Sequence, residues 1–294
     1  MTAHVPTRII VALVVVQVIF GVWPVVGAVL LETLNPAQLI AFRTIFGGVT
    51  LVLVFGRFRP SGRDAVELAF LGALGVASNQ LFFAEGLYRA GPINAAVLSP
   101  LIAPCTLLMA VLARTERPTR PRLIGMAVAF LGALWLVGVE RFETSAERTT
   151  GNLLLLASSL CYGAYLAWSP ATIARLGAFR VVAWVYVFAA LEALPWTAPE
   201  LSTIPWHALG PRELGLLAFV LLGPTFLAYA LNAYALKSVE SSVVALFVYL
   251  QPIVAVATEW LWRGKAIEPR TAAAALVIFV GVGLSTGTLR GRAQ

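Results

Sequence analysis

Residues 88–121 have the sequence YRAGPINAAVLSPLIAPCTLLMAVLARTERPTRP, an Arg-bearing turn followed by an apolar segment with Pro104 inside it and then a basic loop. The same arrangement returns when the sequence is shifted by 148 positions, which places Arg89 on Lys237 and Pro104 on Pro252. Both copies hold the same place in two successive runs of five apolar segments. A repeat of this length indicates a duplicated domain rather than a solenoid of short units.

The composition places most of the chain in a lipid bilayer. Of 294 residues 60% are hydrophobic and 12% are charged, which is about half the charged share of an average soluble protein. Lys and Arg outnumber Asp and Glu by 21 to 14, but they stand singly in short loops between apolar segments. This pattern is typical of membrane topology. We therefore expect a lipid bilayer, and no nucleic acid, as the partner of this chain.

Ten apolar segments of about 20 residues, the length that crosses a bilayer as a helix, follow one another along the sequence. Backbone groups in lipid must be satisfied within the segment, so these segments are expected to be helices. The predicted fold is an all-α polytopic membrane protein with ten transmembrane helices. The expected spans are 9–31, 36–55, 66–87, 93–113, 122–139, 152–173, 178–196, 213–235, 241–262 and 271–288.

The two halves are expected to be inverted repeats of each other. Residues 1–139 form the first five-helix repeat, residues 140–151 an outer linker, and residues 152–294 the second repeat. Five helices is an odd number, so the second repeat enters the membrane upside down. The excess of Lys and Arg on the side of the N-terminus predicts that both termini are cytoplasmic. Inverted repeats are the architecture of transporters that open one central site to each side in turn.

The chain resembles the drug/metabolite transporter superfamily with tandem EamA domains. The resemblance is carried by the ten spans, by Pro36 and Arg43 in the second span, by Gly21 and Gly163 in the first span of each half, and by Pro104 and Pro252. It implies a permease of the bacterial inner membrane that exports amino acids or related metabolites, and the aromatic-amino-acid exporters are the branch it resembles most. It also implies a cavity formed by helices 1–4 and 6–9, with helices 5 and 10 at the periphery.

Charged residues inside the spans have two interpretations each. Arg43 lies too deep to reach the surface easily, and it either pairs with a Glu at a helix end or anchors a substrate carboxylate. Four acids lie near the outer ends of spans: Glu32, Glu85, Glu192 and Glu259. Glu85 with Arg89 has the i, i+4 spacing of a surface ion pair, as Glu259 has with Arg263. The alternative is that the four acids attract cationic groups or carry protons.

Uncharged polar and aromatic residues within the spans are the best candidates for a substrate site. Their donors and acceptors cannot be satisfied by lipid, so they should face the protein interior, where they either bind the ligand or hold helices together. Ser158, Tyr162 and Tyr165 share one helical face. The predicted substrate-binding residues are Gln17, Asn79, Gln80, Ser158, Tyr162, Tyr165, Tyr229, Tyr249 and Gln251.

Prolines and tryptophans in the spans indicate hinges and the membrane interface. Pro104 and Pro252 occupy matching places in the two halves, and each frees a backbone carbonyl, so we interpret them as paired hinges. Tryptophan favours the membrane interface, and six residues near the span ends fit this interfacial belt: Trp23, Trp168, Trp196, Trp206, Trp260 and Trp262.

Other classes of function find less support. The two histidines, His4 and His207, lie in the N-terminal tail and in a loop, so we expect no metal site, no cofactor and no catalytic triad within the spans. A membrane-embedded enzyme, a channel and a permease for another metabolite class remain the alternatives. The prediction is an exporter of amino acids with aromatic or other apolar side chains, acting by alternating access as a monomer or weak oligomer.

Overall fold

The computed structural model describes residues 6–55, 59–138, 145–263 and 269–286. Within these ranges every regular element is a helix. The α-helices are α1 (Thr7–Leu30), α2 (Pro36–Phe55), α3 (Gly62–Gly72), α4 (Asn79–Leu98), α5 (Ile102–Leu112), α6 (Arg120–Val137), α7 (Ala146–Leu176), α8 (Ala178–Leu201), α9 (Pro211–Val220), α10 (Ala228–Leu236), α11 (Ser241–Leu246), α12 (Gln251–Arg263) and α13 (Pro269–Thr286). One short 3₁₀ turn, η4 (Trp206–Ala208), lies in the loop before α9.

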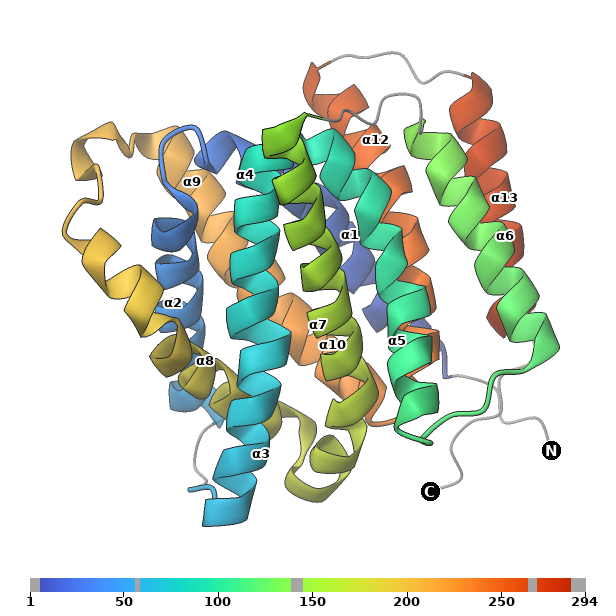
Figure 1. The fold of residues 1–294 in the computed structure, drawn as a ribbon, viewed down its shortest axis with the longest axis horizontal. Helices are drawn as coiled ribbons and strands as arrows, with labels where there is room; N and C mark the ends of the chain where they lie inside the picture. Colours follow the sequence, from blue (N-terminus) through green and yellow to red (C-terminus); the bar gives the residue numbers. More distant parts are fainter. Residues whose placement is uncertain (1–5, 56–58, 139–144, 264–268, 287–294) are drawn as a thin grey trace.

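In the described part of the chain, eight helical stretches are long and apolar enough to cross a membrane, and Ala272–Ser285 is a shorter apolar helix. The longest stretch, Gly62–Leu112, has 51 residues. It is interrupted at Gly91, whose φ of 81° and ψ of 170° are not helical. Glycine accepts a positive φ without strain, and the following Pro92 also disfavours helix at this position. The chain turns back after this break, and α5 descends along α7 (Figure 1).

This break divides the 51-residue stretch in the place where the sequence predicts the end of one span and the start of the next. The multi-pass helical architecture is therefore as predicted. Ten spans and the inverted-repeat layout remain predictions. The first turn of α1 and the last turn of α13 lie on the same side of the molecule, the lower side in Figure 1. We refer to this side as the lower side and to the opposite one as the upper side.

Four departures from α-helical geometry occur in matched pairs. The π-helical segments η1 (Ala73–Ser78) and η5 (Leu221–Leu227) begin 148 positions apart. The 3₁₀ segments η2 (Ser99–Leu101) and η6 (Phe247–Leu250) begin at the same separation. Such segments within long helices often mark functional positions. Their separation equals the shift that aligns the two halves of the sequence.

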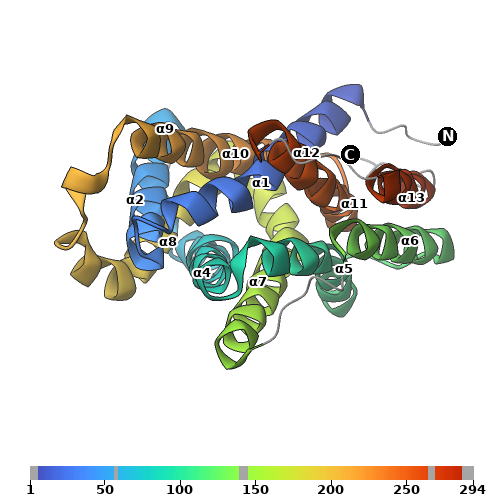
Figure 2. The ribbon, with the colours of Figure 1, turned by 90° about the horizontal axis from the view of Figure 1, so that it is seen from above.

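The two halves interlock along three helix pairs, because α2 packs along α8, α4 along α7, and α6 along α13. The last pair forms one edge of the molecule (Figure 2). Glycines allow this close approach: a Cβ atom on Gly281 would lie 2.4 Å from the backbone nitrogen of Ala129, and one on Gly125 would lie 2.6 Å from the carbonyl oxygen of Gly281. Small residues serve the same purpose between other membrane helices.

Large apolar side chains cover much of the outer surface of the bundle. Leu53 is 77% exposed, and Val66 and Leu131 are more than half exposed. Extensive apolar surface of this kind is unfavourable in water and marks contact with lipid or with another protein. The polar side chains of the spans, in contrast, gather in the interior, between α1, α2, α4, α7 and α10.

Candidate functional site

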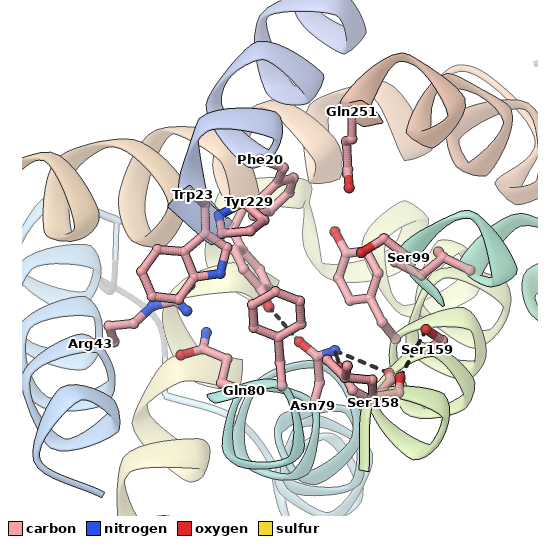
Figure 3. Close-up of a pocket in the computed structure, with 15 residues that line it drawn as sticks. Phe20, Trp23, Arg43, Asn79, Gln80, Ser99, Ser158, Ser159, Tyr229 and Gln251 are labelled. Carbon is pink, nitrogen blue, oxygen red and sulfur yellow. Dashed lines mark hydrogen bonds between the residues drawn. The ribbon is translucent and has the colours of Figure 1, made fainter. Parts of the chain in front are cut away.

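A cavity lies between the two halves of the chain, with about 610 Å³ of atom-free space that includes some open solvent. Its walls come from α1, α2, α4, α5, α7, α10, α12 and the 3₁₀ segment η2 (Figure 3). Aromatic rings, amides, hydroxyls and one guanidinium share these walls. The lining residues are Phe20, Trp23, Pro24, Arg43, Asn79, Gln80, Phe83, Ser99, Ile102, Leu155, Ser158, Ser159, Tyr162, Tyr229 and Gln251.

Arg43 supplies the only full charge among these lining residues. Its side chain is 3% exposed, its Nε donates to Thr225 Oγ1 at 3.0 Å, and its Nη2 donates to the Pro224 carbonyl at 3.5 Å. The guanidinium carbon lies 4.5 Å from the centroid of the Trp23 ring, a cation–π contact. Thr225 and Pro224 belong to the π-helical segment η5.

These partners are all uncharged, so the pairing of Arg43 with a Glu at a helix end stays a prediction. Among the side chains that the structure describes, none of the ion pairs within 4.0 Å includes Arg43. Glu85, one of the acids near the helix ends, forms the i, i+4 ion pair with Arg89 that its spacing indicates, at 3.2 Å. The side chain of Glu259 lies outside the described residues. The positive charge of Arg43 thus faces the cavity without a carboxylate from the described part of the chain.

Asn79 connects the two halves across the cavity wall. Its Nδ2 donates to the Ser158 carbonyl at 3.1 Å and to Ser158 Oγ at 2.9 Å. The Tyr229 hydroxyl donates to the carbonyl of Gly75, in the π-helical segment η1, at 2.6 Å. Gln80 donates from Nε2 to the Tyr186 hydroxyl at 3.0 Å. The other amide atom, Gln80 Oε1, is buried and accepts no hydrogen bond from the described residues.

Aromatic rings pack together in a layer beside the cavity. Tyr162 and Tyr229 pack edge to face with centroids 6.1 Å apart, and Tyr186 lies 5.1 Å from Tyr229. Phe20 adds a ring 6.4 Å from Tyr162. Edge-to-face pairs of this kind are favourable beyond the area they bury. The Tyr162 hydroxyl accepts a hydrogen bond from Asn232 Nδ2 at 2.6 Å, so this aromatic layer is also held by a buried polar contact.

Nine residues are predicted from the sequence to bind substrate, and six of them line the cavity: Asn79, Gln80, Ser158, Tyr162, Tyr229 and Gln251. The other three lie behind the walls. Gln17 is buried and accepts a hydrogen bond from Gln251 Nε2 at 2.8 Å. Tyr165 is stacked on Tyr162. Tyr249 is fully buried, and its hydroxyl has no partner among the described residues.

Several important residues are not found by sequence reasoning. Trp23, expected in the interfacial belt, is 4% exposed and lies over Arg43. Tyr186 and Asn232 support the walls, although neither is a sequence candidate. Trp196, Trp206 and Trp260 are 58%, 61% and 46% exposed, as an interfacial residue can be. A mid-span amide is the signal that could have indicated Asn232, because lipid satisfies none of its hydrogen bonds.

A second buried polar cluster joins the halves at the lower side, where α6 and α11 begin. Arg122 Nη1 lies 3.4 Å from Glu116 Oε2, and Arg122 Nη2 donates to Glu240 Oε2. Arg122 Nη1 also donates to Ser242 Oγ at 3.1 Å, and the Ser242 amide donates to Glu116 Oε1 at 3.2 Å. We call these four residues the lower ion cluster. Arg122, the first residue of the predicted span 122–139, is 4% exposed.

The two candidate hinge prolines, Pro104 and Pro252, have no contact that assigns a role to them. Pro104 lies in the first turn of α5 and Pro252 in the first turn of α12. Each follows a 3₁₀ segment closely, so their hinge role stays a prediction. Within the described ranges, no group of three or more His, Cys, Asp or Glu side chains gathers as a metal site would require.

Comparison with known proteins identifies the class. Residues 7–138 and 149–287 each match the EamA-like transporter family. The chain therefore belongs to the EamA-like transporter family, within the drug/metabolite transporter superfamily, and it carries two EamA repeats. A family of membrane transporters fits the apolar helices and the cavity between the halves. The relatives named as transporters point away from an enzyme.

Two curated relatives span nearly the same length. The probable terminal-alkyne amino-acid exporter of Streptantibioticus cattleyicolor is 28% identical over 275 residues, which cover 89% of this chain and 88% of that one. The uncharacterized transporter YdfC of Bacillus subtilis is 27% identical over 246 residues, which cover 80% of this chain and 76% of that one. One solved crystal structure superposes with a TM-score of 0.77 at 18% identity, covering 96% of this chain and 97% of that chain, so it shares the fold.

Proposed function

We propose that this protein exports amino acids with apolar or aromatic side chains across the bacterial inner membrane. The observation that carries the proposal is the cavity between the halves, which combines rings, amides and hydroxyls in an apolar setting. Such a lining suits a small zwitterion with an apolar side chain, because a few polar groups orient the ligand and the rings contact its body. One relative is named as a probable amino-acid exporter, which favours this class of solute.

Alternating access is the mechanism that we propose. In this proposal the aromatic layer and the lower ion cluster together close the path from the cavity to the lower side. Both are formed by residues from the two halves, so both would have to separate for the cavity to open to that side. A transporter of this kind exposes one site to each side in turn by rocking one half against the other. We assign the lower side, which holds both ends of the described chain, to the cytoplasm.

The test is efflux from proteoliposomes that contain the purified protein and a labelled solute. We expect saturable efflux of L-phenylalanine and L-leucine that exceeds efflux of D-phenylalanine. A channel would show flux that does not saturate in this way, and an enzyme would convert the solute chemically. Liposomes without protein give the leak rate. Flux of a panel of amino acids at the leak rate would contradict the proposal and favour another metabolite class.

A further inference from the structure

We propose that Arg43 binds the carboxylate of the transported solute, and that a carboxylate beside an apolar body is sufficient for recognition, with or without an amine. This inference rests on the proposed function, because it concerns the same cavity. It widens the substrate class from amino acids to apolar carboxylic acids. The argument follows from the charge, the contacts and the position of Arg43.

The first step concerns charge. An ionised side chain in the membrane is costly and normally pairs with another ionised group or lines a water-filled path. Arg43 is buried, and its hydrogen-bond acceptors are the hydroxyl of Thr225 and the carbonyl of Pro224. Neither removes the net charge. The described residues that line the cavity include Arg43 and no Asp or Glu, so this lining carries one positive charge, which an anionic ligand would neutralise.

The second step concerns geometry. The guanidinium is planar and carries five N–H donors, a shape that matches a carboxylate. Thr225 and Pro224 hold it from the side of the π-helical segment η5, and the Trp23 ring covers one face. Figure 3 shows it extending from α2 toward Trp23 and Gln80, at the wall of the cavity. The contacts therefore fix the orientation of the group, while its position on the wall leaves it within reach of a bound solute.

The third step concerns the amine. A substrate ammonium would find only neutral acceptors on this wall, such as Gln80 Oε1, which accepts no hydrogen bond from the described residues, and the serine hydroxyls. Hydrogen bonds between a guanidinium and a carboxylate are charged on both sides and are about twice as strong as neutral ones. Loss of the carboxylate should therefore weaken binding much more than loss of the amine.

The competing explanation is purely structural, since Arg43 also fastens α2 to the π-helical segment η5. Both roles require the hydrogen bonds with Thr225 and Pro224. Only a ligand-binding role predicts that the carboxylate and the amine of an amino acid contribute unequally to its binding. Ligands that differ in one charged group separate the explanations without any change to the protein.

The experiment measures stabilisation of the purified protein in detergent by added ligands, because a ligand that binds the folded state raises the melting temperature. The probes are L-phenylalanine, 3-phenylpropanoate, which lacks the amine, and 2-phenylethylamine, which lacks the carboxylate. We expect 3-phenylpropanoate to reach half of its maximal shift within about threefold of the concentration that phenylalanine requires. We expect 2-phenylethylamine to require at least about tenfold more, the factor that corresponds to ~1.4 kcal/mol.

Variants at position 43 provide the second measurement. Arg43→Gln should lose the shift with 3-phenylpropanoate, and Arg43→Lys should keep the charge and a weaker shift. The matched control is Arg89→Gln, which removes an exposed Arg outside the cavity and should leave the shift unchanged. If Arg43→Gln does not fold, the comparison of the three ligands on the unchanged protein still distinguishes carboxylate binding from a purely structural role.

Equal potency of 2-phenylethylamine and 3-phenylpropanoate would overturn the inference, as would a normal shift in Arg43→Gln. The absence of a shift with both carboxylates at any concentration would overturn it too. A carboxylate-dependent shift without efflux from proteoliposomes supports the binding site and contradicts the proposed transport function. Efflux of phenylalanine that 2-phenylethylamine inhibits and 3-phenylpropanoate does not would leave transport standing and refute the role of Arg43.

Discussion

Arg122 and Glu240 join the two halves of the protein at its lower side, where Nη2 of the buried arginine donates to the carboxylate at the start of α11. Glu116 approaches the same guanidinium from the loop after α5. Two carboxylates and one guanidinium in a desolvated setting are stable only together, because removing the arginine leaves buried negative charge uncompensated. The cluster is therefore suited to holding the two halves together at the lower side.

The first prediction concerns this closure. Arg122→Gln should destabilise the closed arrangement by about 3–5 kcal/mol, the usual cost of breaking a buried pair, and should open a path from the lower side to Asn232. The measurement is the alkylation rate of a cysteine at position 232, with Cys105 and Cys161 replaced by alanine, in inside-out vesicles treated with an impermeant thiol reagent. We expect at least a fivefold increase.

The control for this prediction is Arg120→Gln, which removes an exposed charge two residues away. Glu240→Gln is the milder variant, since the Glu240 side chain is 27% exposed, and it should accelerate labelling less than Arg122→Gln does. Unchanged labelling in both cluster variants would show that the lower ion cluster does not control access.

The second prediction concerns the π-helical segment η1. A Cβ atom on Gly75 would lie 2.4 Å from the Tyr165 ring, whereas one on Gly215 in α9 would meet no atom within 4 Å. Gly75→Ala should therefore destabilise the protein by about 1–3 kcal/mol, as overpacking does, and Gly215→Ala should be neutral or slightly stabilising. Melting temperatures of the two purified variants in one detergent provide the comparison. Equal melting temperatures would mean that the Tyr165 ring moves aside at little cost.

Helix positions and the class of the fold follow from the sequence because the apolar segments are long and the loops between them are short. The 148-residue shift that aligns the two halves of the sequence also separates the irregular segments: η1 and η5 begin that far apart, as do η2 and η6. Mid-span amides indicate much of the cavity, since Asn79, Gln80 and Gln251 all line it. A polar residue inside an apolar segment can be recognised in the sequence, because lipid cannot satisfy its hydrogen bonds and it must face the protein interior.

Other features depend on tertiary contacts that no local pattern carries. Trp23 has the position of an interfacial residue, and only the approach of α2 turns it into a cover for Arg43. Arg122 resembles a loop charge until Glu240, more than a hundred positions away, comes beside it. Tyr165 shares a helical face with Tyr162, yet it packs against Gly75 rather than into the cavity. In each case the sequence gives the residue's chemistry and the partner helix decides its role.

The third prediction concerns aromatic selectivity. Phe20 lines the cavity and places its ring near Tyr162 and Tyr229. Phe20→Leu should keep most of the apolar volume and lose ring contacts, which contribute about 0.5–1.5 kcal/mol. Efflux of phenylalanine should fall roughly two- to tenfold relative to efflux of leucine. The control is Phe279→Leu on the exposed face of α13. An equal loss for both solutes would mean that Phe20 only fills space.

The fourth prediction concerns topology. Arg117 is exposed in the loop between α5 and α6, and Arg212 is exposed in the first turn of α9. Figure 1 places that loop at the lower side and the start of α9 at the upper side. With Cys105 and Cys161 replaced by alanine, a cysteine at position 212 should react with an impermeant reagent added to intact cells, and a cysteine at position 117 should react only after the membrane is opened. The reverse pattern would invert the orientation assigned to the protein and leave the fold untouched.

The central claim is that the solute crosses the membrane through the cavity between the halves, and a cysteine placed in its wall tests this most directly. Ser159 lines the cavity, so Ser159→Cys in the protein without native cysteines should transport phenylalanine and should lose efflux when a small thiol reagent is added. Phenylalanine in excess should slow this inactivation. Arg212→Cys, which reacts on the surface, should keep its efflux after the same treatment. Undiminished efflux after complete modification of position 159 would contradict the account.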